Sequence, residues 1–324
     1  KFHNIGSFLQ AQYAASEKVN MTIGARYDIN SRYGSSFNPR MGIVYKPGNT
    51  TTIKLLYGSA FLAPSPSTAY VQYGSFHTHD SGKTWHSHFL HLPNPGLKPI
   101  RSYNTELNIS QQVSDNIIVT ADAYYTVLKG LYAYADDNAT TQLYNNMFNG
   151  VAVDYIEVFV NRNRQKNYGG SLRLNWKHYF GHVRMNAYAS YSYVNGVIQD
   201  GSGKDTEIDF IAHNMGRIGA DVRIGTFTVS PRLLMMGKQH LPGIAESDGS
   251  LITRQNIPGY ELLNIALRYQ ARKHLAIFAN ITNALNQDYR NVSFNMDLNN
   301  KNTELFYGQH QDPIRIMGGI HVGL

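Results

Sequence analysis

The residues best suited to coordination chemistry lie in one polar stretch, between residues 62 and 100. That stretch contains five histidines: His77, His79, His86, His88 and His91. Neutral imidazole is a good ligand for copper, zinc, nickel and haem iron. In an extended segment, histidines two residues apart face the same side. The pattern predicts a ligand or metal site with His86, His88 and His91 as its foremost candidates. The alternative is that these histidines only decorate a polar loop.

Aromatic side chains occur beside the histidines and in a second polar stretch near residues 135–163. Their rings could stack on a siderophore, a porphyrin or a sugar, or they could pack the loops against one another; both readings stay open. The residues are Tyr70, Tyr73, Phe76, Trp85, Phe89, Tyr144 and Phe148.

Catalytic patterns are missing from the sequence. It has no Gly-x-Ser-x-Gly elbow, no His-Glu-x-x-His pair and no phosphate-binding loop, and its 324 residues include no cysteine. The formal charge is +7, but the basic residues are scattered singly and form no basic run. We therefore predict no enzyme, no cofactor and no nucleic-acid partner.

The elements that must position these residues are predicted to be β-strands, because apolar and polar residues alternate with a period of two. In residues 19–28, for example, Val19, Met21 and Ile23 alternate with polar neighbours. About 13 such segments can be marked: one ending near residue 13, then 19–28, 38–45, 52–61, 105–111, 117–127, 168–176, 183–193, 218–224, 227–235, 263–269, 275–281 and 314–324.

Short turns and long loops alternate between these strands, which is typical of an outer-membrane barrel. No apolar run reaches 18 residues, so an ordinary transmembrane helix is excluded. The chain has 23 Tyr and 14 Phe, which suits aromatic girdles at the two membrane interfaces. The predicted fold is an all-β, transmembrane antiparallel β-barrel, and a barrel of this kind contacts lipid and lipopolysaccharide.

Charged side chains fall on the polar parity of the predicted strands, which would face the barrel lumen. Such a wall could attract an anionic substrate or hold a plug by salt bridges, or it could be ordinary solvated charge. The set is Arg26, Arg40, Lys54, Glu106, Asp122, Arg173, Arg184, Arg217, Asp221, Arg223, Arg232, Arg268 and Arg315.

Five stretches carry a more specific resemblance: Phe37–Pro47, Tyr57–Ser65, Asn94–Pro99, Tyr260–Asn264 and Asn280–Arg290. In order and spacing they resemble successive signature stretches of the TonB-dependent outer-membrane receptors, and the likeness runs over residues 1–324. This resemblance implies a 22-stranded barrel filled by an N-terminal plug and energised by the TonB protein. Haem receptors of this family place a haem-ligating histidine in the loop that here holds His86 and His88.

Two positions depart from the family pattern. Ile100 stands where the family often has glutamate, and Leu324 stands where its last residue is usually aromatic. The predicted strand number is odd, so the first strand begins on the long-loop side and the last strand ends on the short-turn side, whereas a complete barrel would start where it ends. This suggests that residues 1–324 are the C-terminal part of a larger barrel, with the plug and the first strands absent and Lys1 a processed or truncated end.

The predicted function is TonB-dependent uptake of a scarce nutrient, foremost a ferric siderophore or another iron chelate, with haem as a further option. A passive porin and a purely structural barrel are the alternatives. The stretch Leu62–Ile100 is predicted to be an outer loop that closes over the ligand, with prolines stiffening its ends and histidines in its middle.

Overall fold

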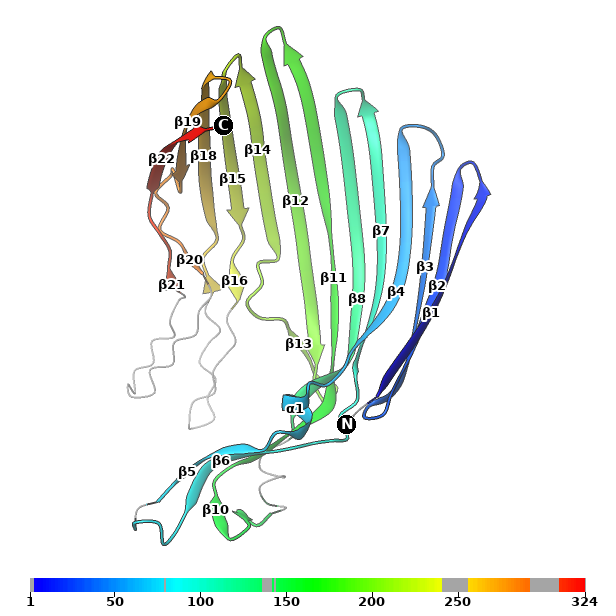
Figure 1. Ribbon diagram of the computed structural model, residues 1–324, viewed down its shortest axis with the longest axis vertical. Coiled ribbons are helices and arrows are strands. Elements are labelled where there is room, and N and C mark those ends of the chain that lie inside the picture. The colour runs from blue at the N-terminus through cyan, green and yellow to red at the C-terminus, as the bar shows by residue number, and fades with distance from the viewer. Residues whose placement is uncertain are drawn as a thin grey trace.

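The computed structural model describes residues 3–78, 80–135, 142, 144–240, 256–291 and 309–323, and an antiparallel sheet dominates it (Figure 1). In this part, thirteen long strands each pair antiparallel with the next along the chain. They are β1 (Asn4–Ser16), β2 (Val19–Asn30), β3 (Gly34–Tyr45), β4 (Thr51–Leu62), β7 (Ile100–Ser114), β8 (Ile117–Tyr134), β11 (Ile156–Phe180), β12 (Val183–Gln199), β14 (Asn214–Ile224), β15 (Phe227–Met236), β18 (Tyr260–Arg272), β19 (Leu275–Thr282) and β22 (Arg315–Val322). The predicted all-β antiparallel architecture is confirmed.

The connections differ at the two ends of the strands. Short turns lie along the upper edge in Figure 1, and the long connections lie along the lower edge, together with the short turn between β2 and β3. Gly181 and Gly225 each begin a two-residue turn at the upper edge, and both have φ of 58°, a conformation that a side chain disfavours. The chain starts at the long-loop edge and β22 runs back toward the short-turn edge, as the strand count predicted.

The two faces of the sheet differ in polarity, because residues paired across neighbouring strands share a face. Ile23 pairs with Met41, and Met41 pairs with Tyr57; all three side chains are exposed. An exposed apolar surface that continues from strand to strand is what a lipid-facing wall requires. No helix in the described residues is long and apolar enough to cross a membrane.

In their described residues, the first two long loops contain secondary structure that the sequence did not predict. The first contains α1 (Pro66–Tyr70), β5 (Tyr73–His77) and β6 (His86–Leu92), and the second contains β9 (Met147–Phe148) and β10 (Val151–Val153). Shorter pieces are β13 (Asp205–Glu207), β16 (Gln239–His240), β17 (Asn256–Ile257), β20 (Arg290–Asn291) and β21 (Gln309–His310). β11 also begins at Ile156, twelve residues before the predicted start at Tyr168.

These loop strands form a small layer at the lower edge of the sheet, which we call the loop sheet: β5, β6, β9, β10 and the first residues of β11 (Figure 1). β6 pairs parallel with both β10 and β11. Leu90, Leu92, Val153 and Ile156 are buried against one another, and Phe148 packs on them. The loop sheet therefore has a hydrophobic core of its own, built from two loops far apart in the sequence.

Candidate functional site

The charged residues predicted to line a lumen share one face of the sheet. Arg40 pairs with Gly24 and Gly58, which sets the parity of this face on β2, β3 and β4. Following the cross-strand pairs from β2 to β22 places all thirteen predicted residues on it. We call it the polar face; its contact with a plug stays a prediction.

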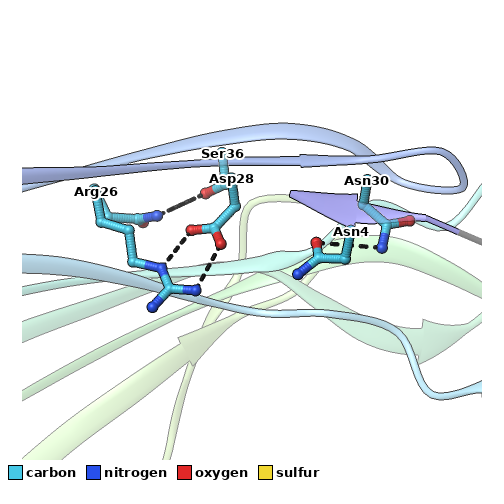
Figure 2. Close-up of polar contacts among 6 residues, drawn as sticks. Asn4, Arg26, Asp28, Asn30 and Ser36 are labelled. Carbon is cyan, nitrogen blue, oxygen red and sulfur yellow. Dashed lines mark hydrogen bonds and ion pairs between the residues drawn. The ribbon is translucent and has the colours of Figure 1, made fainter. Parts of the chain in front are cut away.

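Near the loop end of the polar face, Arg26 and Asp28 form a bidentate ion pair (Figure 2). Arg26 Nε and Nη2 donate to the two carboxylate oxygens at 2.8 and 2.7 Å, although the Asp28 side chain is only 1% exposed. Gly6 lies opposite Asp28, and a Cβ at Gly6 would come within 2.6 Å of the carboxylate. The glycine makes the space that the buried Asp28 carboxylate occupies, while the Arg26 side chain stays exposed.

Positive charge is in excess elsewhere on the polar face. Asp221 accepts hydrogen bonds from Ser230 and from Arg232, each at 2.6 Å. Within the described part of the chain, Arg173 and Arg217 have no carboxylate within ion-pair distance. Uncompensated guanidinium groups on a polar wall are suited to binding carboxylates of another domain or an anionic ligand.

Three histidines gather at the far end of the loop sheet. His77 on β5 pairs directly with His86 on β6, and His86 Nδ1 lies 3.3 Å from His77 Nε2. β6 has one residue more than β5 between successive pairs, so His88 has no cross-strand partner, and its ring stacks on His77 with centroids 4.5 Å apart. Each of the three rings places a nitrogen within 4.8 Å of the others.

A carboxylate from the second long loop joins this cluster. Asp154, between β10 and β11, lies 2.8 Å from His86 Nε2 and 3.1 Å from His88 Nδ1. The hydrogen bond with His88 is the main reason that the pKa of Asp154 is lower than usual, and burial opposes the shift. Its backbone N–H donates to the carbonyl of Ser87 at 3.0 Å, which fixes the carboxylate beside β6.

The structure does not bring the predicted ligand set of His86, His88 and His91 together. His91 lies five residues beyond His86 on the same strand, on the order of 15 Å away. Its side chain is 1% exposed, its Nδ1 lies 3.0 Å from Glu157 Oε1, and its ring stacks on Tyr73. His91 is part of the packing of the loop sheet, and His77 takes its place in the cluster.

The other candidates are spread over the loops. Tyr70 lies under the Arg32 guanidinium, 5.4 Å from the ring centroid. Tyr73 packs between Phe89 and His91, which favours the packing interpretation for this ring. Trp85 is exposed. His79 lies outside the described residues, as do Lys1 and Leu324.

A second histidine group was missed by sequence reasoning. Glu207, His213 and His240 bring ligand atoms within 4.8 Å of one another. His213 Nδ1 contacts the carbonyl of Val194 at 2.8 Å, and its Nε2 lies 2.7 Å from Glu207. A carbonyl oxygen only accepts hydrogen bonds, so Nδ1 of His213 carries a proton. The short contact between Nε2 of His213 and Glu207 also requires a proton on one of these two groups. Both nitrogens of His213 therefore take part in hydrogen bonds, and neither offers a lone pair to a metal ion. Neither this group nor Asp154 shows a sequence signal, because each joins separate loops.

Comparison with known proteins gives a consistent result. Residues 1–284 match the family model described as "TonB dependent receptor-like, beta-barrel". Over 122 residues the chain is 26% identical to the iron-regulated outer membrane virulence protein of Vibrio cholerae, covering 38% of this chain and 17% of that protein.

Solved structures share the fold. The siderophore receptor PirA of Acinetobacter baumannii superposes with a TM-score of 0.74 at 16% identity, over 99% of this chain and 46% of that one. The ferripyoverdine receptor of Pseudomonas aeruginosa, bound to ferripyoverdine, superposes with a TM-score of 0.68 at 17% identity, over 99% of this chain and 38% of that one. The chain thus spans less than half the length of these proteins.

Proposed function

Because the chain belongs to the TonB-dependent receptor family, in its β-barrel part, we propose that it serves energised import of an iron chelate across the outer membrane. The chain is an integral outer-membrane protein. The observation that carries the transport proposal is a sheet with one exposed apolar face and one basic face, whose long loops form a folded layer at one edge. A ferric siderophore is the foremost substrate class, because the similar solved structures include siderophore receptors.

We further propose that the thirteen strands are the C-terminal part of a larger plugged barrel. Two observations support this: the chain spans 38–46% of the similar structures cited above, and in its described residues β1 pairs only with β2 and β22 only with β19. The polar face would then meet the plug, with Arg173 and Arg217 available to its carboxylates. TonB would act through the part of the receptor outside this sequence.

The test is uptake by cells that carry the complete receptor gene. Transport of radioactive iron as a panel of ferric siderophores, and as haem, is compared between a strain with TonB and one without it. We expect saturable uptake of one chelate class that disappears without TonB. A passive porin would instead let small solutes through in both strains and conduct ions steadily in planar bilayers. Either result would overturn the importer proposal.

A further inference from the structure

The tautomers of the histidine cluster follow from its carboxylate. An ionised carboxylate can only accept hydrogen bonds, so the two imidazole nitrogens that face Asp154 carry hydrogen: Nε2 of His86 and Nδ1 of His88. The other nitrogen of each neutral ring then keeps its lone pair. For His86 this is Nδ1, which lies 3.3 Å from Nε2 of His77.

That separation fits two ligands of one metal ion. In a tetrahedral zinc site with Zn–N bonds of about 2.0–2.1 Å, two ligand nitrogens lie roughly 3.3–3.4 Å apart. The third ring offers a nitrogen within 4.8 Å of the other two. The His88 side chain is 68% exposed, so its ring has room to rotate toward the other two nitrogens, which would give up part of its stacking on His77.

Strand pairing and a hydrophobic core support the cluster from below. His77 and His86 are directly paired residues of the β5–β6 hairpin, and the core of Leu90, Val153 and Ile156 holds β6 against the second loop. A carboxylate that accepts from a ligand histidine fixes the orientation of its ring and raises its basicity, which is the usual outer-shell arrangement of metal sites. Asp154 does this for two rings at once.

Imidazole nitrogens as ligands indicate which metal ions the cluster would bind. They suit Zn²⁺, Cu²⁺ and Ni²⁺ rather than Mg²⁺ or Ca²⁺, which prefer oxygen. Haem would need a flat slot beside a ligating nitrogen, whereas these three imidazole rings lie close to one another, with centroids 4.5, 5.0 and 5.6 Å apart.

We propose that His77, His86 and His88 bind one divalent transition-metal ion at the loop sheet, and that Asp154 orients His86 and His88 for it. The site lies on loop residues and does not depend on which chelate the receptor imports. A metal there would tie the first long loop to the second through Asp154.

The experiment uses the complete receptor, purified in detergent, and titrates it with Zn²⁺ by calorimetry and with Co²⁺ by visible absorption. We expect one tight equivalent of Zn²⁺ and the visible bands of a tetrahedral Co²⁺ site. H77A, H86A and H88A should each weaken Zn²⁺ binding by about 100-fold or more, and D154N by about 10–100-fold, the range for an outer-shell partner. H182A is the matched control, because His182 is exposed in a turn at the opposite edge of the sheet.

Barrel assembly of each variant is checked by its heat-modifiable mobility on gels. H88A and D154N change exposed side chains, so they test the site even where H77A or H86A fails to assemble. The proposal is overturned if wild-type receptor binds no stoichiometric Zn²⁺, if H88A and D154N bind it as well as wild type, or if H182A weakens it equally. A haemin Soret shift that H86A abolishes, without Zn²⁺ binding, would assign the cluster to haem instead.

Discussion

His91 is fully enclosed in the loop sheet, and replacing it with alanine is expected to loosen that sheet without affecting the barrel wall. The change leaves Glu157 Oε1 buried without its donor, which costs about 1–3 kcal/mol. It also removes ring contacts with Tyr73 and Phe159, at 4.8 and 5.0 Å between centroids, each contributing about 0.5–1.5 kcal/mol. In the described part of the structure, His91 Nε2 is buried without a hydrogen-bond partner. Alanine removes this unsatisfied nitrogen, which offsets part of the loss. The net loss should be about 2 kcal/mol.

A loss of that size raises the population of the opened loop sheet by roughly 30-fold. The assay is hydrogen exchange of the Leu90 amide, which donates to the carbonyl of Tyr155 at 2.9 Å inside the loop sheet. H88A is the control and should exchange like wild type, because His88 is exposed. H91N should recover part of the protection, since its amide nitrogen can take the place of Nδ1. Unchanged exchange in H91A would refute this reasoning, and so would an equal effect in H88A.

Three further predictions concern other parts of the chain. R26A should destabilise the barrel in urea unfolding, because it leaves the Asp28 carboxylate without its cation. The double variant R26A/D28N should be less destabilised than R26A alone, and equal stability of R26A and wild type would contradict this prediction. G170A should destabilise the protein by about 1–3 kcal/mol, because its Cβ would lie 2.6 Å from a backbone carbonyl oxygen of the neighbouring strand. At Gly58 a Cβ would meet open space, so G58A should destabilise far less. The unfolding temperatures of the two variants test this difference. Asp80 in the β5–β6 turn has its pKa lowered from 3.8 to about 2, chiefly by the hydrogen bond from the Thr84 side chain. Because the pKa of Asp80 is lower in the folded protein, its ionisation stabilises the turn fully above pH 3.8, and this stabilisation is lost as the pH falls through about 2. The backbone amides of the turn should therefore stay protected from exchange at pH 3, and D80N should lose that protection.

The sequence predicts the wall of the sheet well because alternation is a local property. The parity of Ile23 and Arg26 can be read from their immediate neighbours, and the cross-strand register then extends the same face to Arg315. The loop sheet lacks such a local signal. The pairing of His91 with Glu157 joins residues 66 positions apart, and that of His86 with Asp154 joins residues 68 apart. Sequence reasoning therefore finds the histidines but groups them by spacing, which includes His91 and omits Asp154.

The same long-range pairing changes what the first long loop can do. A loop with stiff proline ends would be free to close over a ligand by itself. Here β6 lies between β5 and the second long loop, pairs parallel with β10 and β11, and shares one hydrophobic core with them. Moving residues 73–92 alone would expose Leu90 and Ile156 and break the pairs on one side of β6, which costs several kcal/mol at the usual value of burial. Any rearrangement on ligand binding must therefore carry both loops together, and Asp154 must move with the histidines that it orients.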